Sequence, residues 1–142
     1  MFWKGKAGAR GGLAEQRDEA NAMARQLLEC ANVDFDRGSP LQQALVGTFL
    51  FGMLSAQWMS KKQSGDPRAL AISVFQDTLH YTPEAADQGV QGCIEVTKPG
   101  VHDTMNAIVH RGIDGYRQFL EQDFAGLSTN VGDVLRKFNA TS

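Results

Sequence analysis

Apolar residues recur at three- and four-residue spacing along almost the whole chain, and no segment alternates convincingly between apolar and polar positions. This periodicity predicts α-helices. The first helix runs from Leu13 to Ala31, and its apolar face consists of Leu13, Ala20, Ala24, Leu27, Leu28 and Ala31. The polar break "NVDFDRGSP" follows, so we expect a turn before the next helix.

A second helix is predicted to begin at Pro40, because serine (here Ser39) is a favoured cap and proline is favoured at the first helical position. The segment "LQQALVGTFLFGMLSAQWMSKKQ" is apolar on almost all sides from Ala44 to Met59. A helix without a polar face is either central or membrane-spanning. Its uninterrupted apolar run is shorter than the ~18 residues that a membrane span needs, so we expect a central helix.

Small residues recur on this helix at three- and four-residue spacing, and they are Thr48, Gly52, Ser55 and Ala56. Another helix can approach closely along this small-residue stripe. The partner is either a helix of the same chain or, in an oligomer, a second copy.

Four more helices complete the pattern. Asp66–Pro67 and Thr82–Pro83 each place a capping residue before a proline and begin the third and fourth helices. The fifth runs from Val101 to about Phe124, Gly126 breaks it, and Ser128 or Thr129 caps a short final helix. The sequence therefore predicts an all-α, single-domain bundle of about six helices around a central apolar one, spanning residues 13–142.

Charge is unevenly distributed along the chain. The net charge is −2, but Lys4, Lys6 and Arg10 lie in the first twelve residues, which contain no acid, so residues 13–142 carry −5. We interpret residues 1–12 as a flexible, basic, glycine-rich tail. An acidic body argues against a nucleic-acid partner, which requires a basic face. Because the N-terminus lacks the apolar run of a signal peptide, we expect a cytoplasmic protein that does not bind membranes.

The two cysteines, Cys30 and Cys93, match no zinc-binding spacing and are expected to be buried free thiols. The sequence contains no glycine-rich phosphate loop and no strand–turn–helix context for a nucleophilic serine. We therefore expect no cofactor.

The stretch "VHDTMNAIVHRGIDGYRQF" looks most like a catalytic centre, because it contains two of the three histidines and two aspartates. At 100° per residue, however, it separates into two faces. The inward face holds Met105, Val109, Gly112, Tyr116, Phe119 and Leu120. The outward face holds Asp103, His110, Asp114, Arg117 and Glu121, with His102 at the edge. Proximity in sequence thus does not imply a shared site.

The enzymatic alternative is an HD-type phosphohydrolase, in which His80, the adjacent His102–Asp103 and a later aspartate would hold a metal. Ligands of one metal must converge on a pocket. His80, however, lies opposite the apolar face of the third helix. The outward direction of His80 therefore argues against a metal site.

The exposed acids, histidines and arginines have two interpretations: ordinary solvated helix faces, or a partner-binding surface in which Arg111 and Arg117 are exposed and available. The candidate partner-binding residues are Asp77, His80, Glu84, Asp103, His110, Arg111, Asp114, Arg117 and Glu121. Tyr81 is expected to belong to the core.

The segments "GTFLFGMLSAQWM", "VFQDTLHYTPEAADQGVQ" and "VHDTMNAIVHRGIDGYRQFLEQD" together resemble the small all-α immunity proteins encoded beside polymorphic toxins, including those delivered by contact-dependent or type VI secretion. The resemblance covers roughly Ser39 to Asn139. It implies a cytoplasmic protein that binds one cognate toxin domain and blocks or distorts its active site, without catalysis, cofactor or metal. A helical adaptor that forms homodimers remains the alternative of a different class.

Overall fold

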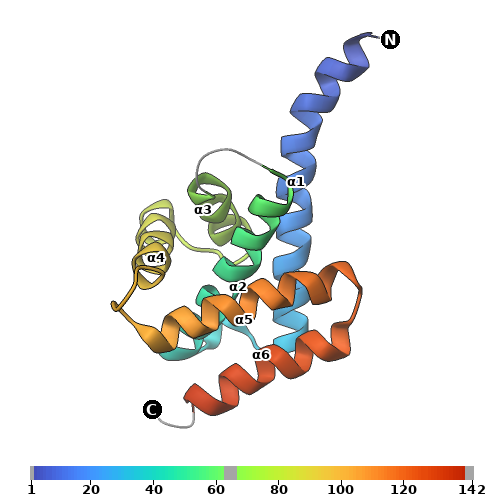
Figure 1. Ribbon diagram of the computed structural model, residues 1–142. Helices are drawn as coiled ribbons and strands as arrows, with labels where there is room; N and C mark the ends of the chain where they lie inside the picture. The colour runs from blue at the N-terminus through green and yellow to red at the C-terminus, as the bar shows by residue number, and fades with distance from the viewer. Residues whose placement is uncertain (1, 63–66, 140–142) are drawn as a thin grey trace.

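The computed structural model describes the backbone of residues 2–62 and 67–139, and the side chains of residues 14–62 and 67–138. Over these ranges the chain forms α-helices, one short 3-10 helix and no strand. The elements are α1 (Phe2–Ala31), η1 (Phe35–Arg37), α2 (Pro40–Ser60), α3 (Arg68–Asp77), α4 (Pro83–Val96), α5 (Asp103–Leu120) and α6 (Phe124–Asn139) (Figure 1). The predicted all-α bundle is confirmed.

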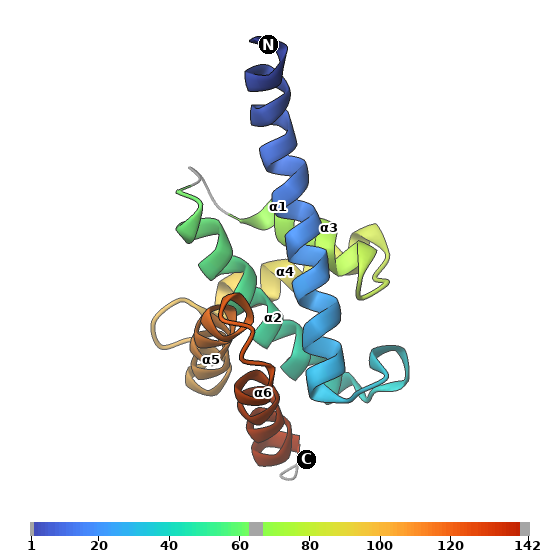
Figure 2. The ribbon, with the colours of Figure 1, turned by 90° about the vertical axis from the view of Figure 1, so that its right-hand side faces the viewer.

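Helix α2 lies at the centre, and the other five α-helices all pack against it (Figure 2). Every residue from Leu45 to Leu54 is buried. Burying one leucine or phenylalanine side chain contributes ~1.5–3 kcal/mol, so this one segment supplies a large part of the stabilisation of the bundle. The prediction of a central helix is confirmed.

The closest helix pair is α2 and α5, which meet at Gly52 and Gly112. A Cβ atom on Gly52 would lie 2.9 Å from the carbonyl carbon of Val109 and 3.0 Å from Gly112 Cα. The small-residue stripe therefore does admit another helix, as predicted. The partner is α5 of the same chain, so Gly52 at the centre of the stripe is not available to a second copy.

Two predicted helix starts are confirmed in detail. The Ser39 and Thr82 hydroxyl groups each accept a hydrogen bond of 3.1 Å, from the Gln42 and Ala85 N–H groups, and proline follows each cap. For α3, Pro67 occupies the capping position and the helix begins at Arg68. The predicted cap Asp66 lies outside the described residues.

The predicted boundary between the last two helices is wrong. Helix α5 ends at Leu120 instead of continuing to Phe124, and α6 already begins at Phe124. Asp123 caps α6, because its carboxylate accepts a hydrogen bond of 2.9 Å from the Gly126 N–H. Gly126 therefore does not break a helix. A Cβ atom there would lie 2.7 Å from Asp123 Cγ, so the glycine makes room for the cap.

Helix α1 contributes Ala20, Met23, Ala24 and Leu27 to the core, all fully buried. It begins at Phe2 instead of Leu13, so its bounds include most of the segment that we interpret as a flexible tail. The flexibility of residues 1–12 stays a prediction.

One residue of the predicted inward face of α5 is misplaced. Leu120 is 53% exposed, because α5 ends there and the chain turns toward α6. Ile108 and the polar Gln118 are buried on this helix instead. None of the described helices has the length and apolar character needed to cross a membrane.

Candidate functional site

The first group of predicted surface residues lies where α3 passes into α4. Asp77, His80 and Glu84 are all exposed there. His80 has a positive φ of 63°, and its Nδ1 lies 3.3 Å from Asp36 Oδ2 beside η1. Asp77 accepts hydrogen bonds from Ser73 and from Asn21 of α1. These residues therefore form a polar surface to which α1, η1, α3 and α4 all contribute.

The adjacent His102 and Asp103 together begin α5. His102 is the capping residue, and its Nδ1 accepts a hydrogen bond of 3.2 Å from the Met105 N–H. Asp103 is exposed, as predicted, and lies in the first turn, where a negative charge interacts favourably with the helix dipole. Sequence reasoning missed the capping role of His102, because histidine is not among the residues that usually take this position.

Asp114, Arg117 and Glu121 form an ion-pair network along the outer face of α5. Arg117 lies 3.0 Å from Asp114 Oδ1 and 2.9 Å from Glu121 Oε1. The hydrogen bond to Asp114, followed by the charges of both carboxylates, raises the pKa of the Arg117 guanidinium. His110 is exposed on the same helix. Arg117 is thus exposed, as predicted, but it is already paired with two carboxylates.

Arg111 is not the freely available cation that the sequence suggests. Its Nε donates to Asn130 Oδ1 at 2.6 Å, and its Nη2 lies 3.7 Å from Asp133 of α6. The buried Asn130 in turn donates to the Arg111 carbonyl and to Gln118 Oε1, each at 3.0 Å. Arg111 therefore joins α5 to α6. Its predicted role in partner binding stays untested.

The structure does not assemble a metal site from the residues of the enzymatic alternative. His80 pairs with Asp36 and His102 caps α5, so the two rings serve separate local roles. Within residues 14–62 and 67–138, no three His, Cys, Asp or Glu side chains lie close enough together to hold a metal ion. Nothing in this geometry favours an HD-type phosphohydrolase.

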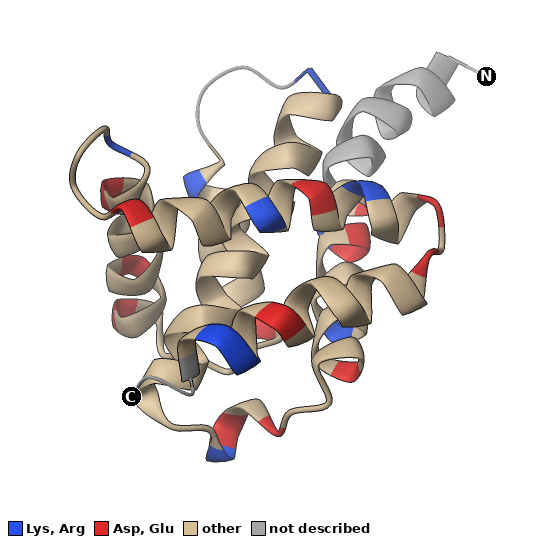
Figure 3. Ribbon diagram, turned by 60° about the horizontal axis from the view of Figure 1, so that its bottom comes forward, with Lys and Arg blue, Asp and Glu red and all other residues tan. Residues whose placement is uncertain are grey.

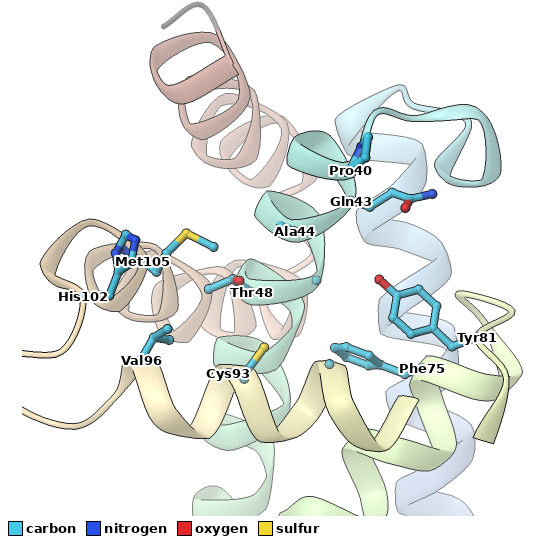
Figure 4. A pocket seen from close by; sticks show the side chains of 13 residues that line it. Pro40, Gln43, Ala44, Thr48, Phe75, Tyr81, Cys93, Val96, His102 and Met105 are labelled. Carbon is cyan, nitrogen blue, oxygen red and sulfur yellow. The ribbon is translucent and has the colours of Figure 1, made fainter. Parts of the chain in front are cut away.

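A hollow of about 430 Å³ lies between α2 and α4, and we call it the α2–α4 groove (Figure 4). Tyr81 and Phe75 stand at one end, and Val96, His102 and Met105 stand at the other. The remaining lining residues are Pro40, Gln43, Ala44, Gly47, Thr48, Gly89, Gly92 and Cys93. Its volume falls in the range of ~300–1,000 Å³ that is usual for binding pockets.

The groove connects two parts of the predicted surface. Tyr81 follows His80 directly, and His102 precedes Asp103 directly, so the α3–α4 group and the start of α5 lie at its two ends. Sequence reasoning assigned Tyr81 to the core, and the side chain is in fact only partly buried, with its ring forming a wall of the groove.

The thiol in the groove is not a reactive nucleophile at neutral pH. Burial raises the pKa of Cys93 from 9.0 to about 11, and a hydrogen bond with Thr48 only partly offsets this. Burial also raises the pKa of Tyr81, with a smaller contribution from Cys93. Both groups are therefore neutral, and the floor of the groove carries no charge. The expected free thiols are present, although Cys30 is only partly buried.

The segments that form the groove are strongly acidic. Residues 33–49 and 78–110 contain six acids and two bases, a net charge of −4, whereas the whole chain carries −2. Figure 3 shows that α4 carries acidic positions and no basic one. The two bases are paired, Arg37 with Asp34 and Lys98 with Glu95, and the hydrogen bond from Lys98 lowers the pKa of Glu95.

Comparison with known protein families gives one match. A family model described as Immunity protein 48 matches residues 16–139, which include every residue that lines the α2–α4 groove. The chain matches no curated protein and no solved structure.

Proposed function

The chain belongs to the Immunity protein 48 family, and from that premise we propose that it neutralises its cognate toxin by binding the toxin directly, without catalysis. The family match over residues 16–139 is the observation that carries this proposal. We further propose that it acts in the cytoplasm.

The described surface supports a binding function. Three of its polar residues have structural roles: His102 caps a helix, Arg117 forms ion pairs, and Arg111 joins α5 to α6. Acidic groups remain exposed on α4 and α5, and acidic inhibitors of basic enzymes gain association rate through charge complementarity. We propose that the toxin contacts the exposed acids of the α3–α4 group and of the outer face of α5.

Co-expression tests the function. The toxin domain encoded next to the gene for this protein should arrest bacterial growth, and co-expression of the protein should restore it. Growth arrest that persists although the protein accumulates in folded form would contradict the proposal.

Charge reversal tests the surface. The triple variant Asp77→Lys, Asp114→Lys and Glu121→Lys should no longer protect cells from the toxin. Each change places a positive charge opposite the positive charges that we expect on the toxin. The matched control is Glu15→Lys, Asp18→Lys and Glu29→Lys, which makes the same change in net charge on exposed positions of α1. Equal protection by both triple variants would exclude these faces as the contact.

A further inference from the structure

Small residues contribute to both walls of the α2–α4 groove. Ala44 and Gly47 face it from α2, and Gly89 and Gly92 face it from α4. A Cβ atom on Gly92 would meet no other atom within 4 Å. Protein interiors normally fill such space with side chains to near-crystalline density. The rings of Phe75 and Tyr81 pack against Gly47 and Gly89, whereas the space beside Gly92 is left open.

Two aromatic rings pack against Tyr81 at one end of the groove. The Tyr81 ring packs edge-on against Phe75, with centroids 5.5 Å apart, and its centroid lies 5.9 Å from that of Phe35. Figure 4 shows the hydroxyl group turned toward the groove, where no hydrogen bond joins it to another described residue. Tyrosines that offer a fixed apolar face and an open polar group are typical anchors of protein interfaces.

Exposed acids on the helices that form the groove indicate what binds there. Glu84, Asp87 and Asp103 are exposed and form no ion pair within the described part of the chain. Building on the proposed function, we infer that the α2–α4 groove receives an apolar side chain of the toxin, carried on a segment with lysine or arginine neighbours. The side chain fills the hollow beside Tyr81, and the basic neighbours are attracted by the exposed acids of α4 and of the start of α5.

A second copy of this chain is a poorer occupant. Dimerisation through the groove would bring the acidic segments of two copies together, and like charges across an interface repel each other. Charge therefore favours a basic partner over self-association.

Filling the groove from either wall tests the inference. We suggest Gly92→Trp on α4 and Ala44→Trp on α2, because Ala44 is exposed and Gly92 has free space around it. The matched controls are Gly132→Trp on α6 and Ala69→Trp on α3, neither of which lines the groove. Thermal unfolding first shows that all four variants fold. The Kd for the toxin domain encoded next to the gene is then measured for each variant and for wild type.

The groove variants should bind the toxin domain at least ~30-fold more weakly than wild type, the effect of losing one interface anchor, while the controls bind within about threefold of wild type. Wild-type affinity in both groove variants would overturn the inference and leave the proposed function intact. Absence of wild-type binding would overturn both. Native mass spectrometry of the protein alone is the second measurement: a dimer that Gly92→Trp dissolves, or a retained small molecule, would assign the groove to that occupant instead.

Discussion

Gly52 of α2 and Gly112 of α5 face each other where the two helices cross, and each leaves space for the backbone of the other. A Cβ atom on Gly52 would lie 3.0 Å from Gly112 Cα, and one on Gly112 would lie 3.1 Å from Gly52 Cα. The close approach of α2 and α5 therefore requires that neither residue carries a Cβ atom. This contact also positions the start of α5, which forms one end of the α2–α4 groove.

Adding either methyl group should destabilise the protein. Gly52→Ala and Gly112→Ala should each lower the free energy of unfolding by ~2–3 kcal/mol, because the methyl group would press on backbone atoms of the other helix, which cannot rotate away. Urea denaturation measures the change. Gly92→Ala is the matched control, since the open space there should let higher helix propensity raise stability by ~0.5–1 kcal/mol. Wild-type stability in Gly112→Ala would show that the helices do not cross this closely.

Asn130 should be the most sensitive polar residue at the α5–α6 contact. Asn130→Ala removes the acceptor of Arg111 Nε and leaves Gln118 without its buried donor. We expect a loss of ~2 kcal/mol in denaturation measurements, since buried polar groups without partners are costly. Arg117→Ala, which breaks only exposed ion pairs, should leave stability close to that of the wild type. Equal effects of the two substitutions would contradict this assignment.

Replacing Gln122 by glycine should stabilise the protein. It follows α5 with a φ of 57°, and the Asp123 N–H donates to the Gln118 carbonyl in the manner of a glycine-terminated helix. Gln122→Gly should raise the melting temperature, because glycine adopts this conformation without the penalty of ~1 kcal/mol paid by other residues. Gln88→Gly, in the middle of α4, should lower it. A lower melting temperature for Gln122→Gly would contradict the backbone conformation at this position.

Cys93 should make stability depend on alkaline pH. Because burial raises the pKa of its thiol from 9.0 to about 11, folding favours the protonated form. The resulting contribution is fully present below pH 9 and is lost as the pH rises through 11, on the order of 3 kcal/mol in total. Denaturation at pH 8–11 should show a steeper loss of stability for wild type than for Cys93→Ala. Parallel curves would show that the thiol ionises in the folded protein as easily as in the unfolded chain.

Local chemistry explains which parts of the fold could be predicted. The caps Ser39 and Thr82 act within one helical turn, and the apolar stretch that becomes α2 is recognisable at any position in a chain. The start of α6 was missed because Gly126 was interpreted as a helix breaker. Asp123 lies three residues before it, which is the spacing of a capping interaction, and that signal was available in the sequence.

The groove could not be predicted in the same way, because it depends on tertiary placement. Nothing in the sequence shows that Gly47 of α2 and Gly92 of α4 face the same space. Arg111 presents a similar case, since its partners Asn130 and Asp133 lie about 20 residues further along the chain. The candidate surface residues are largely exposed as predicted, but the hollow between two of their groups appears only once the helices are packed.

The most direct test of direct toxin binding is a calorimetric titration of the protein with an inactivated form of the toxin domain encoded next to its gene. Our account predicts a saturable 1:1 complex whose affinity falls as salt is added, because acidic groups on this protein contact basic groups on the toxin. Absence of binding at micromolar concentrations, while the same protein still protects cells from the active toxin, would contradict it.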